Sequence, residues 1–321
     1  MSMNTSQIEL RLKRITFEAE RISSFEFVSA DANPLPGFQP GAHIDLHLQQ
    51  GMIRSYSLAN AASADPLYYR VAVQREPNGR GGSRWAHDKL RVGDKVWATP
   101  PQNDFPLDEC ASSTVFFVGG IGITPVLPML RRLDAIGREW KLMYASRSPG
   151  ETAFAEELQR IDAGRGRIVH FHDSEPGQRL EIRATVAALP ASTHVYCCGP
   201  TGMIDDFLAV TAERDPSTVH YERFGAAQQA ATEGGFDVVL HRSGAKYRVE
   251  PGKTILDVLL DNNVAVPYSC CNGVCGSCRT EIIDGQADHR DDFLSDEEKQ
   301  ANQAIMVCCS GARSKTLVLD L

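Results

Sequence analysis

The sequence predicts a multi-domain chain with a small antiparallel β-barrel, then an α/β domain built on a parallel sheet, then a small α+β domain. Three observations lead to this prediction. Pro and Gly interrupt short β-rich runs about every ten residues in the first third, which suits a small barrel. From about residue 112, apolar strands alternate with helical patterns, which is typical of right-handed βαβ units. Six of the nine cysteines lie between Cys270 and Cys309, which suggests a metal site at that end.

The composition is that of a folded protein with more than one domain. Of its 321 residues, 42% are hydrophobic and 23% are charged, which is enough for real cores. The formal net charge of −8 argues against nucleic acid as a partner, because nucleic acid is bound by basic faces. The N-terminal segment is polar and no apolar run is long enough to cross a bilayer. We therefore expect a cytoplasmic protein with no membrane partner, whose cysteines are not disulfides.

The barrel and the parallel sheet are predicted from hydrophobic periodicity. The barrel prediction rests on residues 15–30, 43–48 and 68–76, and the expected domain covers residues 1–109. An apolar strand at Thr114–Gly120 opens the next domain, which is expected to cover residues 110–225. Helices are expected there at residues 125–136 and 153–161, and further strands at residues 140–148, 167–175, 194–200 and 218–224.

The end of the chain is predicted to be a separate domain. Residues 226–234 are small, polar and without periodicity, so we interpret them as a linker. The domain at residues 235–321 is expected to hold strands at residues 236–244, 245–250 and 316–321 and a helix at residues 254–263. Thr254 and Asp257 have the spacing of a capping box at the start of that helix.

The cysteines of this last domain have the spacing of a plant-type [2Fe–2S] site. Cys270, Cys275 and Cys278 give C-x4-C-x2-C, and 29 residues separate Cys278 from Cys308. A loop that supplies three thiolates must curl tightly, which Gly273 and Gly276 permit.

The alternative metal site is structural zinc, which prefers two paired short spacings, whereas here the fourth cysteine stands apart. Cys271 and Cys309 are out of register with the pattern. We interpret them as ordinary small residues, although Cys309 is an alternative to Cys308 as a ligand.

Two glycine-containing turns predict a dinucleotide site. Residues 118–125 end the first parallel strand and open a helix, where a pyrophosphate could approach the backbone. The motif is not G-x-G-x-x-G, and a turn that only packs is the alternative. Residues 197–203 end the fourth strand and start another helix. Because ligands bind at the carboxyl ends of such strands, both turns are expected to face one crevice.

Two segments of the barrel suggest a site for a flat ring with a phosphate. On the strand at residues 54–57, an arginine could hold a phosphate, Tyr56 could stack on a ring and Ser57 could bond a ring nitrogen. Packing is the alternative for a tyrosine in a strand. Gly81, Gly82 and Ser83 precede a short helical stretch, which would suit a terminal phosphate such as that of FMN.

In this order, the motifs RSYS, GGS, GGIGITP, CGP and C-x4-C-x2-C with a distant cysteine closely resemble those of the phthalate dioxygenase reductase family. The resemblance covers nearly the whole chain. It implies a six-stranded antiparallel flavin barrel that binds FMN, an NAD-binding α/β domain and a C-terminal β-grasp ferredoxin domain. It also implies an NADH-dependent reductase of a Rieske-type aromatic oxygenase or demethylase, acting as a monomer.

The resemblance also implies roles for particular residues. Those expected to bind FMN are Arg54, Ser55, Tyr56, Ser57, Val71, Ala72, Val73, Gly81, Gly82, Ser83 and Phe224. Those expected to bind the dinucleotide are Gly120, Ile121, Gly122, Thr124, Ser146, Arg147, Cys197, Gly199 and Pro200. The cluster ligands would be Cys270, Cys275, Cys278 and Cys308.

The choice of dinucleotide is where two lines of reasoning conflict. An acidic residue near the end of the second strand marks NAD in a generic dinucleotide fold, and an arginine marks NADP. Ser146 and Arg147 stand there, so the general rule favours NADPH, while the family resemblance favours NADH. We expect NADH, because the glycine motif is not that of the generic fold.

The expected reaction is electron transfer. NADH gives two electrons as hydride, a [2Fe–2S] cluster takes one at a time, and a flavin does both, so the flavin must lie between them. Hydride transfer needs no side-chain acid or base, so no catalytic residue is assigned.

The electrons are expected to leave for a terminal oxygenase. The acidic run at residues 288–298 could dock a basic patch on that partner, or could be a solvated loop. The alternative functions are a similar reductase that serves a quaternary-amine oxygenase or a P450, and a ferredoxin-like carrier whose first two domains are scaffolding.

Overall fold

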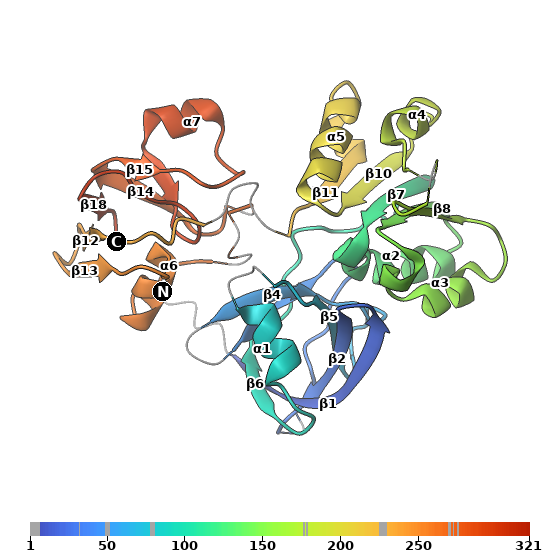
Figure 1. The fold of residues 1–321 in the computed structure, drawn as a ribbon, viewed down its shortest axis with the longest axis horizontal. Helices are drawn as coiled ribbons and strands as arrows, with labels where there is room; N and C mark the ends of the chain where they lie inside the picture. Colours follow the sequence, from blue (N-terminus) through green and yellow to red (C-terminus); the bar gives the residue numbers. More distant parts are fainter. Residues whose placement is uncertain are drawn as a thin grey trace. The chain divides into compact units, whose positions relative to one another are not determined.

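The computed structural model describes residues 7–31, 33–48, 52–77, 81–175, 177, 179–224, 230–268, 271, 273–274 and 276–321 (Figure 1). Its contacts divide the chain into two compact units. The first unit is Met1–Leu48 with Tyr56–Arg223, and the second is Gln49–Ser55 with Phe224–Leu321. In the described parts, no helix has the length and apolar content needed to span a bilayer.

The N-terminal strands form one six-stranded sheet in the order β4-β3-β6-β1-β2-β5, with antiparallel pairing, as predicted. The strands are β1 (Ile8–Ala19), β2 (Ile22–Ser29), β3 (His43–His47), β4 (Ile53–Ser57), β5 (Tyr69–Gln74) and β6 (Lys95–Ala98). A short helix, α1 (Gly82–Asp88), follows β5. Buried and exposed side chains alternate on β6, which is the period-two pattern of a strand with one face on the core.

A parallel five-stranded sheet follows, in the order β11-β10-β7-β8-β9. Its strands are β7 (Ser113–Gly119), β8 (Glu139–Ser146), β9 (Ile168–His172), β10 (His194–Cys198) and β11 (Val219–Glu222). Its helices are α2 (Ile123–Ala135), α3 (Ala155–Asp162), α4 (Ile182–Ala187) and α5 (Thr201–Thr211), with short 3₁₀ turns η2 (Gly120–Gly122), η3 (Pro149–Glu151) and η4 (Pro216–Thr218). Helices α2 and α3 cover one face and α4 and α5 the other. The sequence predicted every strand but not α4.

The antiparallel and parallel sheets share one hydrophobic core. Ala19, Ile22 and Ala72 of the first sheet belong to the same buried cluster as Phe116 of β7 and Leu127 of α2. The boundary predicted near residue 109 therefore lies inside one compact unit.

An ion pair joins the antiparallel sheet to a helix that covers the parallel sheet. Arg70 donates two hydrogen bonds of 2.8 Å to Glu157, joining β5 to α3.

The C-terminal sheet is mixed, with the order β13-β12-β18-β14-β16. Its strands are β12 (Phe236–Leu240), β13 (Lys246–Val249), β14 (Arg279–Asp284), β16 (Ala304–Met306) and β18 (Thr316–Leu319), and a small ribbon pairs β15 (Ala287–Asp288) with β17 (Gly311–Ala312). Strands β12 and β18 are parallel, and the other pairs are antiparallel. The predicted capping box of Thr254 and Asp257 starts α6 (Ile255–Asp261).

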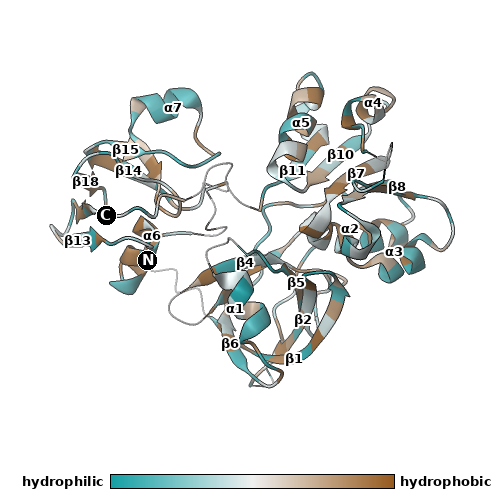
Figure 2. Ribbon diagram, in the orientation of Figure 1, coloured by the Kyte–Doolittle hydropathy of each residue, from teal (hydrophilic) through white to brown (hydrophobic). Residues whose placement is uncertain are grey.

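The acidic run at residues 288–298 is not only a loop. It leads into α7 (Asp296–Ala301), which the sequence analysis did not predict. Ser295 and Glu298 form a capping box, and three acidic residues in the first turn complement the helix dipole. None of its residues is buried, and Figure 2 shows it as hydrophilic.

The end of the predicted linker is bound to the second unit. Ala231 is buried, and its N–H donates to the carbonyl of Cys309 at 2.7 Å. Thr232 accepts a hydrogen bond of 2.8 Å from Gly252. Residues 225–229 lie outside the described part of the chain.

Candidate dinucleotide, flavin and cluster sites

The two predicted glycine turns are in direct contact. A Cβ on Gly122 would lie 2.2 Å from the carbonyl oxygen of Cys198, and one on Gly199 would lie 2.9 Å from the nitrogen of Gly119. Such distances are closer than side chains allow, so only glycine permits the loops after β7 and β10 to approach this closely. The structure thus brings together the two turns that sequence reasoning expected to face one crevice. Their backbone fits the approach of a pyrophosphate at the carboxyl edge of the sheet.

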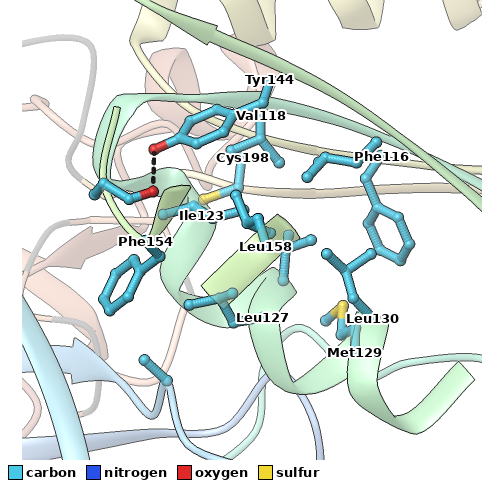
Figure 3. Close-up of a cluster of buried hydrophobic side chains, with 14 of the residues drawn as sticks. Phe116, Val118, Ile123, Leu127, Met129, Leu130, Tyr144, Phe154, Leu158 and Cys198 are labelled. Carbon is cyan, nitrogen blue, oxygen red and sulfur yellow. Dashed lines mark hydrogen bonds between the residues drawn. The ribbon is translucent and has the colours of Figure 1, made fainter. Parts of the chain in front are cut away.

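Hydrogen bonds from neighbouring side chains hold the first turn. The Tyr144 hydroxyl donates to the carbonyl of Gly120 at 3.0 Å and to that of Ala153 at 3.4 Å. Thr124 donates its hydroxyl to the carbonyl of Ile121 at 3.0 Å. Burial raises the pKa of Tyr144, which keeps its hydroxyl a donor. Figure 3 shows Tyr144 in the same buried cluster as Cys198.

The adjacent cysteines of β10 face opposite sides of the sheet. Cys197 packs with Phe207 under α4 and α5, and burial raises its pKa to about 12. Cys198 lies in the cluster under α2, and its carbonyl is the one that Gly122 meets. Cys198 therefore lies on the face of the sheet that α2 covers, and Cys197 lies on the opposite face. Strand alternation predicts that adjacent residues face opposite sides of the sheet, but not which side each one faces.

Sequence reasoning also missed Glu222. Its Oε2 lies 4.0 Å from the Cys198 thiol, on the neighbouring strand β11. Burial raises the pKa of the Glu222 carboxyl to about 8, and the charge of Asp104 adds to the shift. Glu222 is thus mainly protonated at neutral pH, and its Oε2 accepts the hydrogen bond of the buried Cys198 thiol. Nothing in the local sequence marks it, because the environment comes from strands far apart in the chain.

Ser146 and Arg147, the two residues at which the sequence is expected to distinguish NADH from NADPH, lie at the end of β8. The Ser146 hydroxyl lies 2.7 Å from the Thr152 hydroxyl and 3.0 Å from Nδ1 of His172, and it donates to the carbonyl of Ser148 at 3.1 Å. Its capacity for hydrogen bonds is used within the protein. Arg147 is 66% exposed at its side chain, and one guanidinium nitrogen lies 3.9 Å from Glu151.

The predicted flavin residues are spread over β4, β5 and α1. Ser57 and residues 71–73 are buried in the first unit. The N–H of Glu76 donates to the Ser83 hydroxyl at 3.1 Å, which fixes the start of α1. Gly81 has the positive φ of 90° that favours glycine, and Gly82 begins the helix.

Other predicted flavin residues belong to the second unit. Arg54, Ser55 and Phe224 fall there, and Arg54 donates to the carbonyl of Ile53 at 2.7 Å. Phe224 is 39% exposed.

Two of the four predicted cluster ligands lie together in the second unit. The thiols of Cys278 and Cys308 are buried and interact directly. That contact, with the neighbouring Cys309 thiol and burial, raises the pKa of Cys308. Cys270 and Cys275 lie outside the described residues. Among the described residues, no three metal-ligating side chains gather at one point.

The cysteine loop has the backbone that the glycines predicted. Gly273 and Gly276 have φ values of 75° and 78°. A Cβ on Gly273 would lie 2.3 Å from the Cys309 sulfur, and one on Gly276 equally close to the Phe293 ring. Paired thiols beside a tightly curled glycine loop fit a thiolate-bound iron–sulfur cluster.

Comparison with known proteins identifies the domains that hold the dinucleotide site and the cluster site. Residues 116–208 match the oxidoreductase NAD-binding domain, and residues 238–313 match the 2Fe-2S iron-sulfur cluster binding domain. Phenoxybenzoate dioxygenase subunit beta of Ectopseudomonas oleovorans is 45% identical, over 98% of this chain and 97% of that one. The carnitine monooxygenase reductase subunit of Escherichia coli (strain K12) is 39% identical, over 98% of both. A solved structure of phthalate dioxygenase reductase matches with a TM-score of 0.89 and 41% identity, over 98% of both chains.

The chain belongs to the phthalate dioxygenase reductase family. As a member of this family it is an oxidoreductase that passes electrons from a nicotinamide dinucleotide through a flavin to a [2Fe–2S] cluster. The three sheets described above are the flavin barrel, the NAD sheet and the ferredoxin sheet of that family.

Proposed function

We propose that the chain is the NADH-dependent reductase component of a Rieske-type aromatic-ring oxygenase or demethylase, with FMN as its flavin, and that it acts as a monomer. The observation that carries the proposal is the contact between the glycine turns after β7 and β10, in a chain that also pairs Cys278 with Cys308. The first feature suits a dinucleotide and the second a one-electron carrier. The names of relatives such as phenoxybenzoate dioxygenase subunit beta support an aromatic oxygenase as the acceptor.

The flavin would be held by the barrel. Tyr56 and Ser57 at the end of β4 and residues 71–73 on β5 would line the ring, with Gly81–Ser83 at the phosphate. A bound flavin supplies the conversion of one two-electron donor into two single-electron transfers. The hydrogen bond from the Glu76 N–H already holds the Ser83 hydroxyl, which supports a phosphate site that would need little rearrangement to bind.

The dinucleotide would lie along the joined turns. Gly120 and Gly122 would leave the backbone open to the pyrophosphate, with Thr124 and Tyr144 holding the shape of the turn. At the other loop, Gly199 would allow the nicotinamide end to approach Cys198. Protonated Glu222 would keep this region uncharged, which favours a ring that becomes cationic only after it has given up hydride.

A second candidate differs only in the acceptor. The carnitine monooxygenase reductase subunit is 39% identical over nearly its whole length, so an oxygenase acting on a quaternary amine is the alternative partner. The cofactor sites are the same under both readings, because the acceptor is recognised by a surface.

The test begins with a visible spectrum of the purified protein before and after anaerobic NADH. Flavin and cluster bands that both bleach are expected, and the flavin released by acid should co-elute with FMN. Cluster absorbance without flavin, and no response to NADH, would leave a ferredoxin-like carrier and overturn the proposal. Coupled turnover with purified Rieske oxygenases then separates aromatic from quaternary-amine acceptors.

A further inference from the structure

The carboxyl end of β8 is the place where a dinucleotide fold distinguishes NADH from NADPH. Strand β8 runs parallel to β7, and Ala145 pairs with Gly119 at the glycine turn. In such sheets an acidic side chain at this end bonds the adenosine ribose, whereas an arginine accommodates the 2′-phosphate of NADP. Arg147 follows β8 directly, so the local sequence alone favours NADPH.

The structure gives Arg147 an acidic neighbour that the strand itself does not contain. Glu151 of η3 places Oε2 3.9 Å from the Arg147 guanidinium and 3.3 Å from that of Arg21. Arg21 comes from the turn between β1 and β2, 130 residues away. One carboxylate therefore lies within ion-pair distance of two arginines.

This arrangement is held by the backbone. Arg21 has the positive φ of 63°, and the N–H of Glu20 beside it donates to the carbonyl of Gly150 at 3.0 Å. The barrel turn thus docks against η3 next to Glu151. The Glu151 side chain is 22% exposed, while that of Arg147 is 66% exposed. Glu151 is therefore less exposed, and more constrained by its surroundings, than Arg147.

The segment after β9 adds further negative charge. The N–H groups of Asp173 and Ser174 donate to the carbonyls of Ser146 and Arg147, at 3.1 and 2.9 Å. Asp173 and Glu175 therefore lie on a turn that runs beside the end of β8. With Glu151 they give three carboxylates against two arginines, which disfavours a dianionic phosphate.

We propose that Glu151 determines the specificity for NADH, because it occupies the two arginines that would otherwise bind the 2′-phosphate of NADPH. This inference rests on the NADH dependence proposed above. Ser146 is not the discriminating residue, because its hydroxyl is already bonded to Ser148 and lies against Thr152 and His172. Removing the Glu151 charge should release Arg21 and Arg147 as a doubly positive site.

The test measures binding of two probes, adenosine 2′,5′-bisphosphate and 5′-AMP, to the flavin- and cluster-loaded protein by calorimetry. Glu151→Gln is expected to raise affinity for the bisphosphate about tenfold at low salt and to leave affinity for 5′-AMP nearly unchanged. The gain should shrink as ionic strength rises. Adding Arg147→Ala to Glu151→Gln should remove much of it.

Glu156→Gln is the matched control, because Glu156 is an exposed residue at the start of α3 and the substitution makes the same change in net charge. It should move neither affinity. The proposal is overturned if Glu151→Gln and Glu156→Gln bind both probes alike. A wild-type protein that already prefers the bisphosphate contradicts the NADH dependence itself, whereas an NADH-selective wild type with an unaltered Glu151→Gln contradicts only the role of Glu151.

Discussion

The Cys198 thiol lies 4.0 Å from the Glu222 carboxyl, at paired positions on the parallel strands β10 and β11. Burial is the main cause that raises the pKa of each group, and the charge of Glu222 adds to the shift of the Cys198 thiol. Both groups are therefore mainly neutral at pH 7.

Replacing Glu222 with glutamine should alter how stability depends on pH. The folded-state pKa of about 8 exceeds the usual value of 4.5, so the folded protein binds the extra proton. The stability that the folded protein gains by binding this proton is fully present below about pH 4.5 and is lost as the pH rises towards 8. Wild type should therefore lose roughly 2–4 kcal/mol relative to Glu222→Gln between pH 5 and 8, measured by urea unfolding. Glu213→Gln, at an exposed position, should follow wild type, and parallel curves for all three proteins would refute the assignment.

The buried ion pair of Arg70 and Glu157 should stabilise the first unit. Although burial acts to raise it, hydrogen bonds and charge from Arg70 and Arg131 hold the pKa of Glu157 below its usual value. The stabilisation from ionised Glu157 is fully present above the usual glutamate pKa, and it is lost as the pH falls through the lower pKa of the folded protein. Arg70→Met leaves a buried carboxylate and should cost about 3–5 kcal/mol of unfolding free energy at pH 7.

Arg131→Met is the control for this pair, since Arg131 bonds the same carboxylate but its side chain is 39% exposed, against 13% for Arg70. It should cost about 1 kcal/mol. Equal losses for the two variants would show that burial does not decide the strength of this pair.

Gly122→Ala should damage the dinucleotide site. The added Cβ meets the Cys198 carbonyl at 2.2 Å, and this atom is backbone, so the two turns must move apart. We expect a loss of about 1–3 kcal/mol in stability and a several-fold higher KM for NADH. Gly202→Ala makes the same substitution in α5 with open space around the new atom, and should leave KM unchanged and stability equal or slightly raised. An unchanged KM in Gly122→Ala would remove the turn from the site.

The variants Cys308→Ser and Cys309→Ser should show which of these two adjacent cysteines binds the cluster. Cys308 interacts with the Cys278 thiol, whereas the Cys309 sulfur packs where Gly273 has no side chain. Purified Cys308→Ser should contain little iron and lack the visible circular dichroism of a [2Fe–2S] cluster, while Cys309→Ser should retain both. The reverse result would assign Cys309 as the ligand.

The sequence was most informative where one local requirement decides the structure. Glycines at positive φ, the Thr254 capping box and the apolar strand before Gly120 each depend on a few adjacent residues. All three were predicted. The NAD sheet was predicted as well, because fully apolar parallel strands have few alternative packings.

The features that sequence reasoning missed depend on contacts distant in the chain. The faces on which Cys197 and Cys198 lie are known only once both covering layers are known. Arg147 alone indicates NADPH, and its pairing with Glu151 becomes significant only when Arg21 arrives from the barrel. Helix α7 was missed because it buries no residue and so has no hydrophobic periodicity.

The hydrophobic core shared by the barrel and the parallel sheet constrains how such reductases can be recombined. A crossover near residue 110 would separate Ala19 and Ile22 from Phe116 and Leu127 and force two unrelated surfaces to fit. A crossover after Arg223 leaves that core intact. Functional chimeras should therefore inherit the flavin and dinucleotide segments from one parent, and an exchanged ferredoxin segment should bring its own counterpart of Gln49–Ser55.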